Sequence, residues 1–199
     1  METRKFSTRQ IAFTAVMTAL VAVATMVLHV QTGESYTNLG DTMIFLAAAF
    51  FGPVPGLIAG GIGSFLADLI TYPVTMWFTL VIKGIEGLIA GLGIYYANKL
   101  FEKSKKEKKD KIIKDVLYLV SCLVAAAWMV LGYYLAKAFS YGTPESALVS
   151  LPKNCLQGGL SIIIAAILYY ALKPAVQNII SPRKKIAEIS NEEEKKDIE

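Results

Sequence analysis

The stretch YTNLGDTMIFLAAAFFGPVPGLIAGGIGSFLAD, which runs from Tyr36 to Asp68, decides the fold of this chain. It predicts a polar loop, a helix, a tight turn and a second helix, and both helices are too apolar for a surface that faces water. The turn is Gly52-Pro53-Val54-Pro55-Gly56, where two prolines bounded by glycines stop the first helix and reverse the chain.

Small residues recur at every fourth position after this turn. One stripe comprises Gly56, Gly60, Ser64 and Asp68, and a second small face lies beside it. Stripes of this kind let helix backbones approach closely in lipid, where no hydrophobic drive acts between helices. The first stripe ends on a carboxylate. An acid at the seam between packed apolar helices is costly, so Asp68 is a candidate functional residue.

The composition is typical of a membrane protein with several spans. Of the 199 residues, 54% are hydrophobic and only 18% are charged. The length accommodates about six spans of roughly 20 residues. We therefore expect an all-α integral membrane protein, with a six-helix domain over residues 1–180 and a charged, unstructured cytoplasmic tail over 181–199.

The sparse cysteine and histidine content argues against a disulfide framework and against a metal site. Cys122 and Cys155 both lie in apolar runs, and His29 is the only histidine. The apolar run from Ile11 to Val30 resembles a signal peptide at first sight. It is long enough to span a membrane, however, and no cleavage pattern follows, so we expect a retained first helix.

The apolar runs and their breaks predict the six helices and the orientation of the bundle. The expected helices cover about Thr8–Val30, Asp41–Phe51, Val54–Leu69, Thr75–Lys99, Ile112–Phe139, and a sixth that Thr143-Pro144-Glu145 opens and that ends near Lys173-Pro174. Lysine and arginine gather at the N-terminus, in the loop 99–114 and after residue 173, while the three loops of the opposite face have none. Cationic loops stay inside, so both termini are expected in the cytoplasm.

With this topology, the polar groups of the helices lie in the outer half of the bundle or near its middle. Lys83 and Glu86 share one helix face, and Asn154 and Gln157 share another. A few polar groups on apolar, aromatic walls are typical of a small-molecule pocket. The candidate substrate-binding residues are Glu34, Tyr36, Asn38, Asp41, Asp68, Tyr72, Trp77, Lys83, Glu86, Tyr133, Lys137, Lys153, Asn154 and Gln157.

Structural explanations compete with this pocket. Lys83 and Glu86 can simply pair, and Asp68 can pair with a lysine of another helix. Asn38 and Asp41 are also suited to cap the second helix. The aromatic residues near span ends can form an interfacial belt.

The first helix has a face of alanines, which are Ala12, Ala15, Ala19 and Ala22. Either this face packs against a neighbouring helix of the same chain, or it is a docking surface for a partner protein.

Several short motifs resemble the substrate-binding S components of energy-coupling factor (ECF) vitamin transporters. The resemblance extends from about residue 7 to 173 and includes the alanine pattern Ala15-Val16-Met17-Thr18-Ala19 of the first helix. The other matching motifs are Asn38-Leu39-Gly40-Asp41, Phe51-Gly52-Pro53-x-x-Gly56, Ala59-Gly60-Gly61-Ile62-Gly63-Ser64, Ala67-Asp68, Lys83-Gly84 and Pro152-x-Asn154-x-x-Gln157.

This resemblance implies a plasma-membrane protein, not an enzyme, that captures a water-soluble vitamin or precursor from outside. The branch that it matches best is associated with riboflavin, hydroxymethylpyrimidine and pyridoxine-like substrates. The implied partner is an ECF module of one transmembrane coupling subunit and two ATPases, which use ATP, while this chain binds no cofactor. Consistently, the sequence has no phosphate loop of the GxxxxGK[ST] type.

Two other functions stay open at this level. One is a stand-alone small-solute transporter or channel. The other is an intramembrane enzyme that uses Lys83, Glu86 or Asp68, which the lack of any histidine other than His29 at a span end disfavours.

Overall fold

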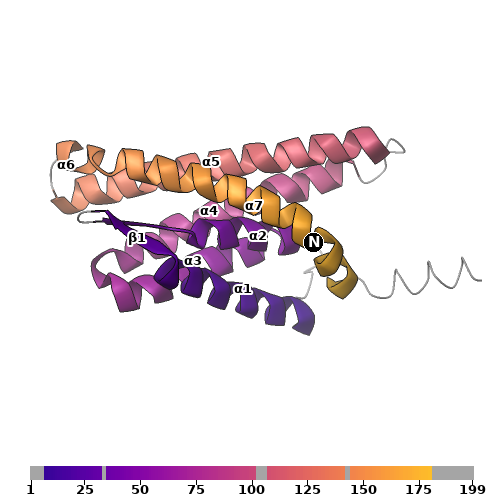
Figure 1. Cartoon of the computed structure of the whole chain (residues 1–199), viewed down its shortest axis with the longest axis horizontal. Coiled ribbons are helices and arrows are strands. Elements are labelled where there is room, and N and C mark those ends of the chain that lie inside the picture. The colour runs from indigo at the N-terminus through magenta and orange to yellow at the C-terminus, as the bar shows by residue number, and fades with distance from the viewer. Residues whose placement is uncertain (1–6, 33–34, 102–106, 142–143, 181–199) are drawn as a thin grey trace, which may run out of the picture.

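The computed structural model describes residues 7–32, 35–101, 107–141 and 144–180 (Figure 1). Its helices are α1 (Thr8–Val27), α2 (Gly40–Phe51), α3 (Pro53–Thr71), α4 (Met76–Leu100), α5 (Glu107–Tyr141), α6 (Pro144–Leu148) and α7 (Leu151–Ile180). A 3-10 turn at Pro73–Thr75 precedes α4, and two strands, β1 (His29–Thr32) and β2 (Ser35–Asn38), follow α1. Figure 1 shows α5 and α7 along one side of the bundle, α1 along the other, and α2 between them.

Local sequence signals set several helix ends. A capping box starts α1, because the Ser7 hydroxyl accepts from the Gln10 N–H at 3.2 Å and the Gln10 side chain accepts from the Ser7 N–H at 3.0 Å. Gly52 joins α2 to α3 with a φ of 94°, a backbone angle that favours glycine. Pro53 then occupies the start of α3, where its missing N–H costs nothing.

The small residues of α3 produce the tightest packing in the bundle. A Cβ atom added at Gly56 would overlap the backbone carbonyl of Gly87, and one added at Gly60 would overlap that of Lys83. On the α1 side, a Cβ at Gly63 would come within 2.7 Å of the Thr18 carbonyl. The predicted stripes are therefore confirmed as contact surfaces, and they fix how α3 faces α1 and α4.

Five described helical segments are long and apolar enough to cross a membrane, and they belong to α1, α3, α4, α5 and α7. Helix α2 has only 12 residues, so it is about 18 Å long, well short of a 30 Å hydrocarbon core. It is nevertheless central, because it contacts α1, α3, α4 and α7. Its Ile44 and Phe45 are fully buried in the core.

The structure differs from the sequence expectation at three places. The polar stretch before α2 forms an antiparallel hairpin, in which His29 pairs with Asn38 and Thr32 with Ser35. Four-residue strands carry too little periodicity to be recognised without their pairing partner. The expected sixth helix is divided into α6 and α7, and Pro174 lies inside α7 instead of ending it.

The break between α6 and α7 occurs at Ser150. Its N–H and hydroxyl both bond the Ala147 carbonyl, at 3.1 and 2.8 Å, which completes the last turn of α6. Its own carbonyl accepts from the Asn154 N–H at 3.1 Å and so starts α7. Thr143 and the expected tail from residue 181 lie outside the described residues.

Candidate functional site

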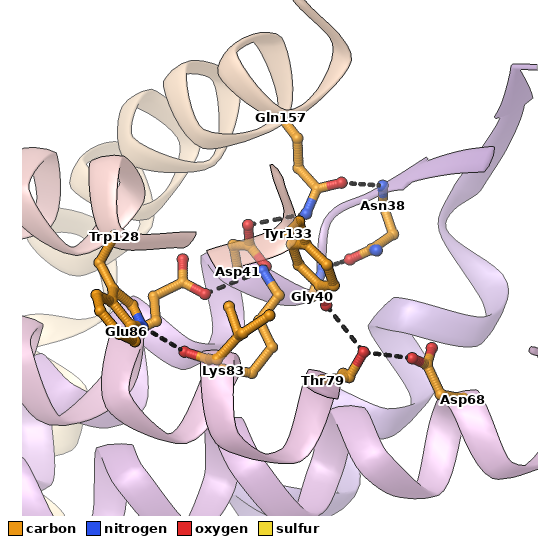
Figure 2. A network of polar contacts seen from close by, with 11 residues as sticks. Asn38, Gly40, Asp41, Asp68, Thr79, Lys83, Glu86, Trp128, Tyr133 and Gln157 are labelled. Carbon is orange, nitrogen blue, oxygen red and sulfur yellow. Dashed lines mark hydrogen bonds and ion pairs between the residues drawn. The ribbon is translucent and has the colours of Figure 1, made fainter. Parts of the chain in front are cut away.

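A buried ionic cluster lies where α2 meets α4 (Figure 2). The Lys83 ammonium donates to Asp41 Oδ1 and lies 2.9 Å from Glu86 Oε2. Lys83 is 3% exposed, and both carboxylate residues are 0% exposed. Two carboxylates therefore face one ammonium in an environment shielded from water.

Helix geometry explains why these three groups meet. Asp41 is in the first turn of α2, where the helix dipole favours an acid. Lys83 and Glu86 are three residues apart and share one face of α4. Contact of both Gly60 and Gly87 with the Ile44 side chain brings this face of α4 close to α2. The pairing of Lys83 with Glu86, which was the structural alternative to a pocket, is thus present, and Asp41 is a second partner of the lysine.

Gln157 of α7 connects this cluster to the hairpin. Its side-chain amide donates to Asp41 Oδ2 at 2.9 Å, and its oxygen accepts from the Asn38 N–H at 3.1 Å. The Asn38 side chain in turn accepts from the Gly40 N–H at 2.8 Å. Asn38 is not the N-cap residue, because Leu39 occupies that position, but its side chain still satisfies the first N–H of α2.

A second branch of the network connects Asp68 to the lysine. Asp68 Oδ2 accepts from the hydroxyls of Thr79 at 2.5 Å and Thr75 at 3.2 Å. The Thr79 hydroxyl is also 3.0 Å from the Tyr133 hydroxyl, and the Tyr133 ring centre is 5.6 Å from Lys83 Nζ. Helices α3, α4 and α5 are therefore joined by polar contacts in one continuous network (Figure 2).

The sequence analysis missed three members of this network, which are Thr75, Thr79 and Trp128. Thr79 is four residues before Lys83 on α4, a spacing that could have revealed their common face. Trp128 of α5 donates from its indole N–H to the Ile82 carbonyl at 3.1 Å. Because the acceptor is a backbone carbonyl, no pattern of side chains in the sequence predicts this hydrogen bond.

Several buried polar atoms around the network have no hydrogen-bond partner among the described residues. They are Glu86 Oε1, Asn154 Nδ2, Ser161 Oγ, Thr42 Oγ1 and Thr25 Oγ1, while Glu86 Oε2 has its ion pair with Lys83 at 2.9 Å. Asn154, Gln157 and Ser161 repeat at helical spacing and lie on one face of α7. Each unsatisfied buried group costs about 1–3 kcal/mol, so these atoms are suited to bind a polar ligand or water.

The remaining candidates are distributed differently. Trp77 is 62% exposed and its ring packs against Phe65 at 5.1 Å, so it lies apart from the buried network. Tyr72, Lys137 and Lys153 are half-buried, at the end of α3, near the end of α5 and at the start of α7. Tyr36 pairs with Gln31 in the hairpin, and Glu34 lies outside the described residues.

The alanine face of α1 is largely uncovered. Ala12, Ala15 and Ala19 are exposed, while Thr14, Met17 and Val21 on the other side are buried. Ala22 is only 7% exposed, so its inclusion in a docking surface is wrong. The surface comprises the first three alanines, and we call Ala12, Ala15 and Ala19 the alanine face. Internal packing does not explain these three residues.

The chain is similar to several known proteins. A family model described as "ECF-type riboflavin transporter, S component" matches residues 5–174. An uncharacterized protein in the gap 3' region of Pyrococcus woesei is 37% identical over 162 residues, which are 80% of this chain and 99% of that protein. The thiamine precursor transporter HmpT of Lactococcus lactis is 29% identical over 174 residues, 85% of this chain and 88% of the relative.

The fold has a solved counterpart. The structure of the S component of a bacterial ECF transporter matches with a TM-score of 0.59 and 19% sequence identity. The match covers 84% of this chain and 97% of the other. Within the described residues, no group of three His, Cys, Asp or Glu side chains is placed to hold a metal ion.

Proposed function

Because the chain belongs to the family of ECF-type riboflavin transporter S components, we propose that it captures a water-soluble vitamin or precursor outside the cell for ATP-driven uptake. Members of the family are components of plasma-membrane transporters and are not enzymes. This chain is accordingly a plasma-membrane protein with several apolar spans.

The substrate is a small, flat, polar molecule of the riboflavin, hydroxymethylpyrimidine or pyridoxine type. The observation that carries this proposal is the group of unsatisfied polar atoms around the buried ionic cluster, from Asn154 on α7 to Glu86 on α4. In this proposal Asn154 and Gln157 contact the ligand by directional hydrogen bonds, and Tyr133 supplies an aromatic wall. Similarity to a thiamine precursor transporter supports a substrate of this size.

Transport requires partners that supply energy. We assign to this chain an ECF module of one transmembrane coupling subunit and two ATPases, which hydrolyse ATP, while the chain itself holds no cofactor. The alanine face supports this assignment, because three small exposed residues permit close approach of a partner helix. For ligand capture outside and docking of the ECF module, we propose six membrane segments, of which α2 is the short one. Both termini then lie in the cytoplasm.

Purification, native mass spectrometry and reconstitution test this function together. We expect a vitamin-sized ligand to stay bound to the purified protein. We also expect vesicles to accumulate that ligand only when the coupling subunit, both ATPases and ATP are present. Uptake without the ATPases would indicate a stand-alone transporter. Failure to bind any ligand of the three types, together with no ATP-dependent uptake, would contradict the proposal.

A further inference from the structure

An apolar groove lies on the surface of the bundle between α5 and α7. It has a volume of about 420 Å³, and only aliphatic side chains line it, among them Leu119 of α5 and Ile162, Ala166 and Ile167 of α7. Ile167 is 63% exposed, so the groove is open to the surroundings of the bundle. Both helices contain segments long and apolar enough to cross a membrane. The groove therefore faces lipid acyl chains, and an unfilled groove would forfeit dispersion contacts along its lining.

One end of this groove is polar. Figure 1 shows the start of α5 and the end of α7 at the same end of the bundle. There, Asp115 is four residues before Leu119 on α5, and Lys173 is seven residues after Ala166 on α7. At these spacings each charged residue continues the helix face that lines the groove. Each also lies three residues inside the end of its apolar span, so both lie near the membrane boundary, where lipid headgroups begin.

The two charged side chains at this end each contact a tyrosine of α7. The Lys173 ammonium lies over the Tyr169 ring, 4.8 Å from its centre. The Asp115 carboxylate interacts with the Tyr170 hydroxyl. Both charged residues are half-buried. The groove thus ends at one cation and one acid that are accessible from the membrane boundary.

The length of the groove matches one leaflet of a bilayer. Ile162 and Lys173 are 11 residues apart on α7, which is about 16 Å along the helix. Half of a hydrocarbon core of about 30 Å is about 15 Å. An acyl chain that fills the groove therefore brings its own headgroup to the level of Asp115 and Lys173.

We propose that the groove between α5 and α7 binds a phospholipid whose headgroup carries a primary amine, as phosphatidylethanolamine does. The acyl chain fills the groove, Lys173 binds the phosphate, and Asp115 accepts a hydrogen bond from the ammonium group. Both contacts are charge-assisted. This inference goes beyond vitamin uptake and does not depend on it. In the proposed orientation, the lipid belongs to the cytoplasmic leaflet.

The charges at the end of the groove select among headgroups. A headgroup that has a phosphate but no amine would leave Asp115 beside a negative charge. A quaternary ammonium, as in phosphatidylcholine, has no N–H to donate to the Asp115 carboxylate. A primary ammonium provides both the positive charge and the donor, so it is the headgroup that the pair of Asp115 and Lys173 fits best.

Native mass spectrometry of the purified full-length protein tests this selection. The probes are phosphatidylethanolamine, phosphatidylcholine and phosphatidylglycerol with identical acyl chains. We expect the first to bind roughly 5- to 10-fold more tightly than the other two, about the contribution of one hydrogen bond. In Asp115→Asn the ratio should fall to about one, because the charge that strengthens this bond is lost. Lys173→Gln should weaken binding of all three lipids, whereas Lys99→Gln, which alters an exposed lysine in the last turn of α4, should not.

Photolabelling tests the apolar part of the site. A phosphatidylethanolamine with a diazirine in its acyl chain should label Leu119 or Ile167. Ala166→Phe fills the groove, so it should reduce this labelling and the affinity for all three lipids. Val81→Phe is the matched control, because it places the same bulk in the smaller groove between α3 and α4, of about 270 Å³, and should change neither.

Several results would overturn the proposal. Equal affinities for the three lipids in the wild-type protein, or labelling confined to other helices, would exclude the lipid site. An unchanged ratio in Asp115→Asn would exclude the headgroup contact. Dimers of the lipid-free protein that Ala166→Phe dissociates would assign the groove to a second copy of the chain instead. If Ala166→Phe fails to fold, the labelling of the wild-type protein and the ratio in Asp115→Asn still decide the question.

Discussion

Gln157 donates a 2.9 Å hydrogen bond to Asp41 although the two residues are 116 positions apart in the chain. The same side chain accepts from the Asn38 N–H at 3.1 Å, so one amide joins α7, the start of α2 and the base of the hairpin. Any ligand that inserts among these groups must replace or rearrange these bonds. A ligand that changes the hydrogen bonds of Gln157 therefore also acts on the hairpin.

Substitution of the α7 amides should weaken ligand binding. Gln157→Ala and Asn154→Ala each remove a buried polar group worth about 1–3 kcal/mol, or roughly 5- to 150-fold in affinity. Calorimetry with the identified ligand measures the loss, and Asn98→Ala, an exposed amide on α4, serves as the control. Wild-type affinity in both α7 variants would place the site elsewhere.

Removal of the buried lysine should cost stability. Lys83→Met leaves Asp41 and Glu86 without their cation, and breaking a buried ion pair in this way costs about 3–5 kcal/mol. The thermal midpoint should therefore fall well below that of the wild-type protein. The double variant Lys83→Met/Glu86→Gln should recover part of the loss, because it removes one of the two uncompensated charges. A midpoint equal to wild type in Lys83→Met would show that the cluster does not stabilise the fold.

The glycine contact between α3 and α4 should be intolerant of even one methyl group. Gly60→Ala places a Cβ against the Lys83 carbonyl, so the helices must separate and the ionic cluster must shift. We expect a lower thermal midpoint and weaker ligand binding. Gly159→Ala is the matched control, since nothing lies within 4 Å of the added Cβ among the described residues. Equal behaviour of the two variants would contradict the close packing.

Bulky residues on the alanine face should separate binding from transport. Ala15→Trp and Ala19→Trp alter exposed positions, so ligand affinity should stay near wild type while ATP-dependent uptake with the ECF module is lost. Leu123→Trp, on the exposed side of α5, controls for a bulky residue in lipid. A joint loss of affinity, uptake and thermal stability would mean that the face packs inside the bundle, and normal uptake would also refute docking.

The orientation of the bundle can be tested by cysteine labelling of intact cells. After Cys122 and Cys155 are replaced, the thiol introduced by Glu145→Cys should react with a membrane-impermeant thiol reagent. The thiol introduced by Lys109→Cys should react only after the cells are permeabilised, because lysine-rich segments stay in the cytoplasm. The reverse pattern would invert the topology.

The sequence by itself determined the membrane class, the approximate helices and several of the residues that meet in the network. Apolar composition and helical periodicity are local properties, so they predicted α3 and α4 to within a few residues. The stripe of Gly56, Gly60, Ser64 and Asp68 identified the packing surface because small side chains are needed wherever backbones touch. The scarcity of charges inside the spans then placed Asp41, Lys83 and Glu86, together with Asp68, among the candidates.

Only the tertiary structure decided which of these groups pair. Lys83 joins Asp41 across 42 positions because the glycine contacts of α3 and α4 set the rotation and depth of each helix relative to α2. No local sequence pattern determines the rotation or the depth of a helix relative to its neighbours. The same reason explains why Thr79 was missed, why Trp77 faces outward and why the hairpin formed from a stretch that looked like a loop. Each depends on a partner that the chain supplies from another helix or strand, and such partners are fixed by three-dimensional packing.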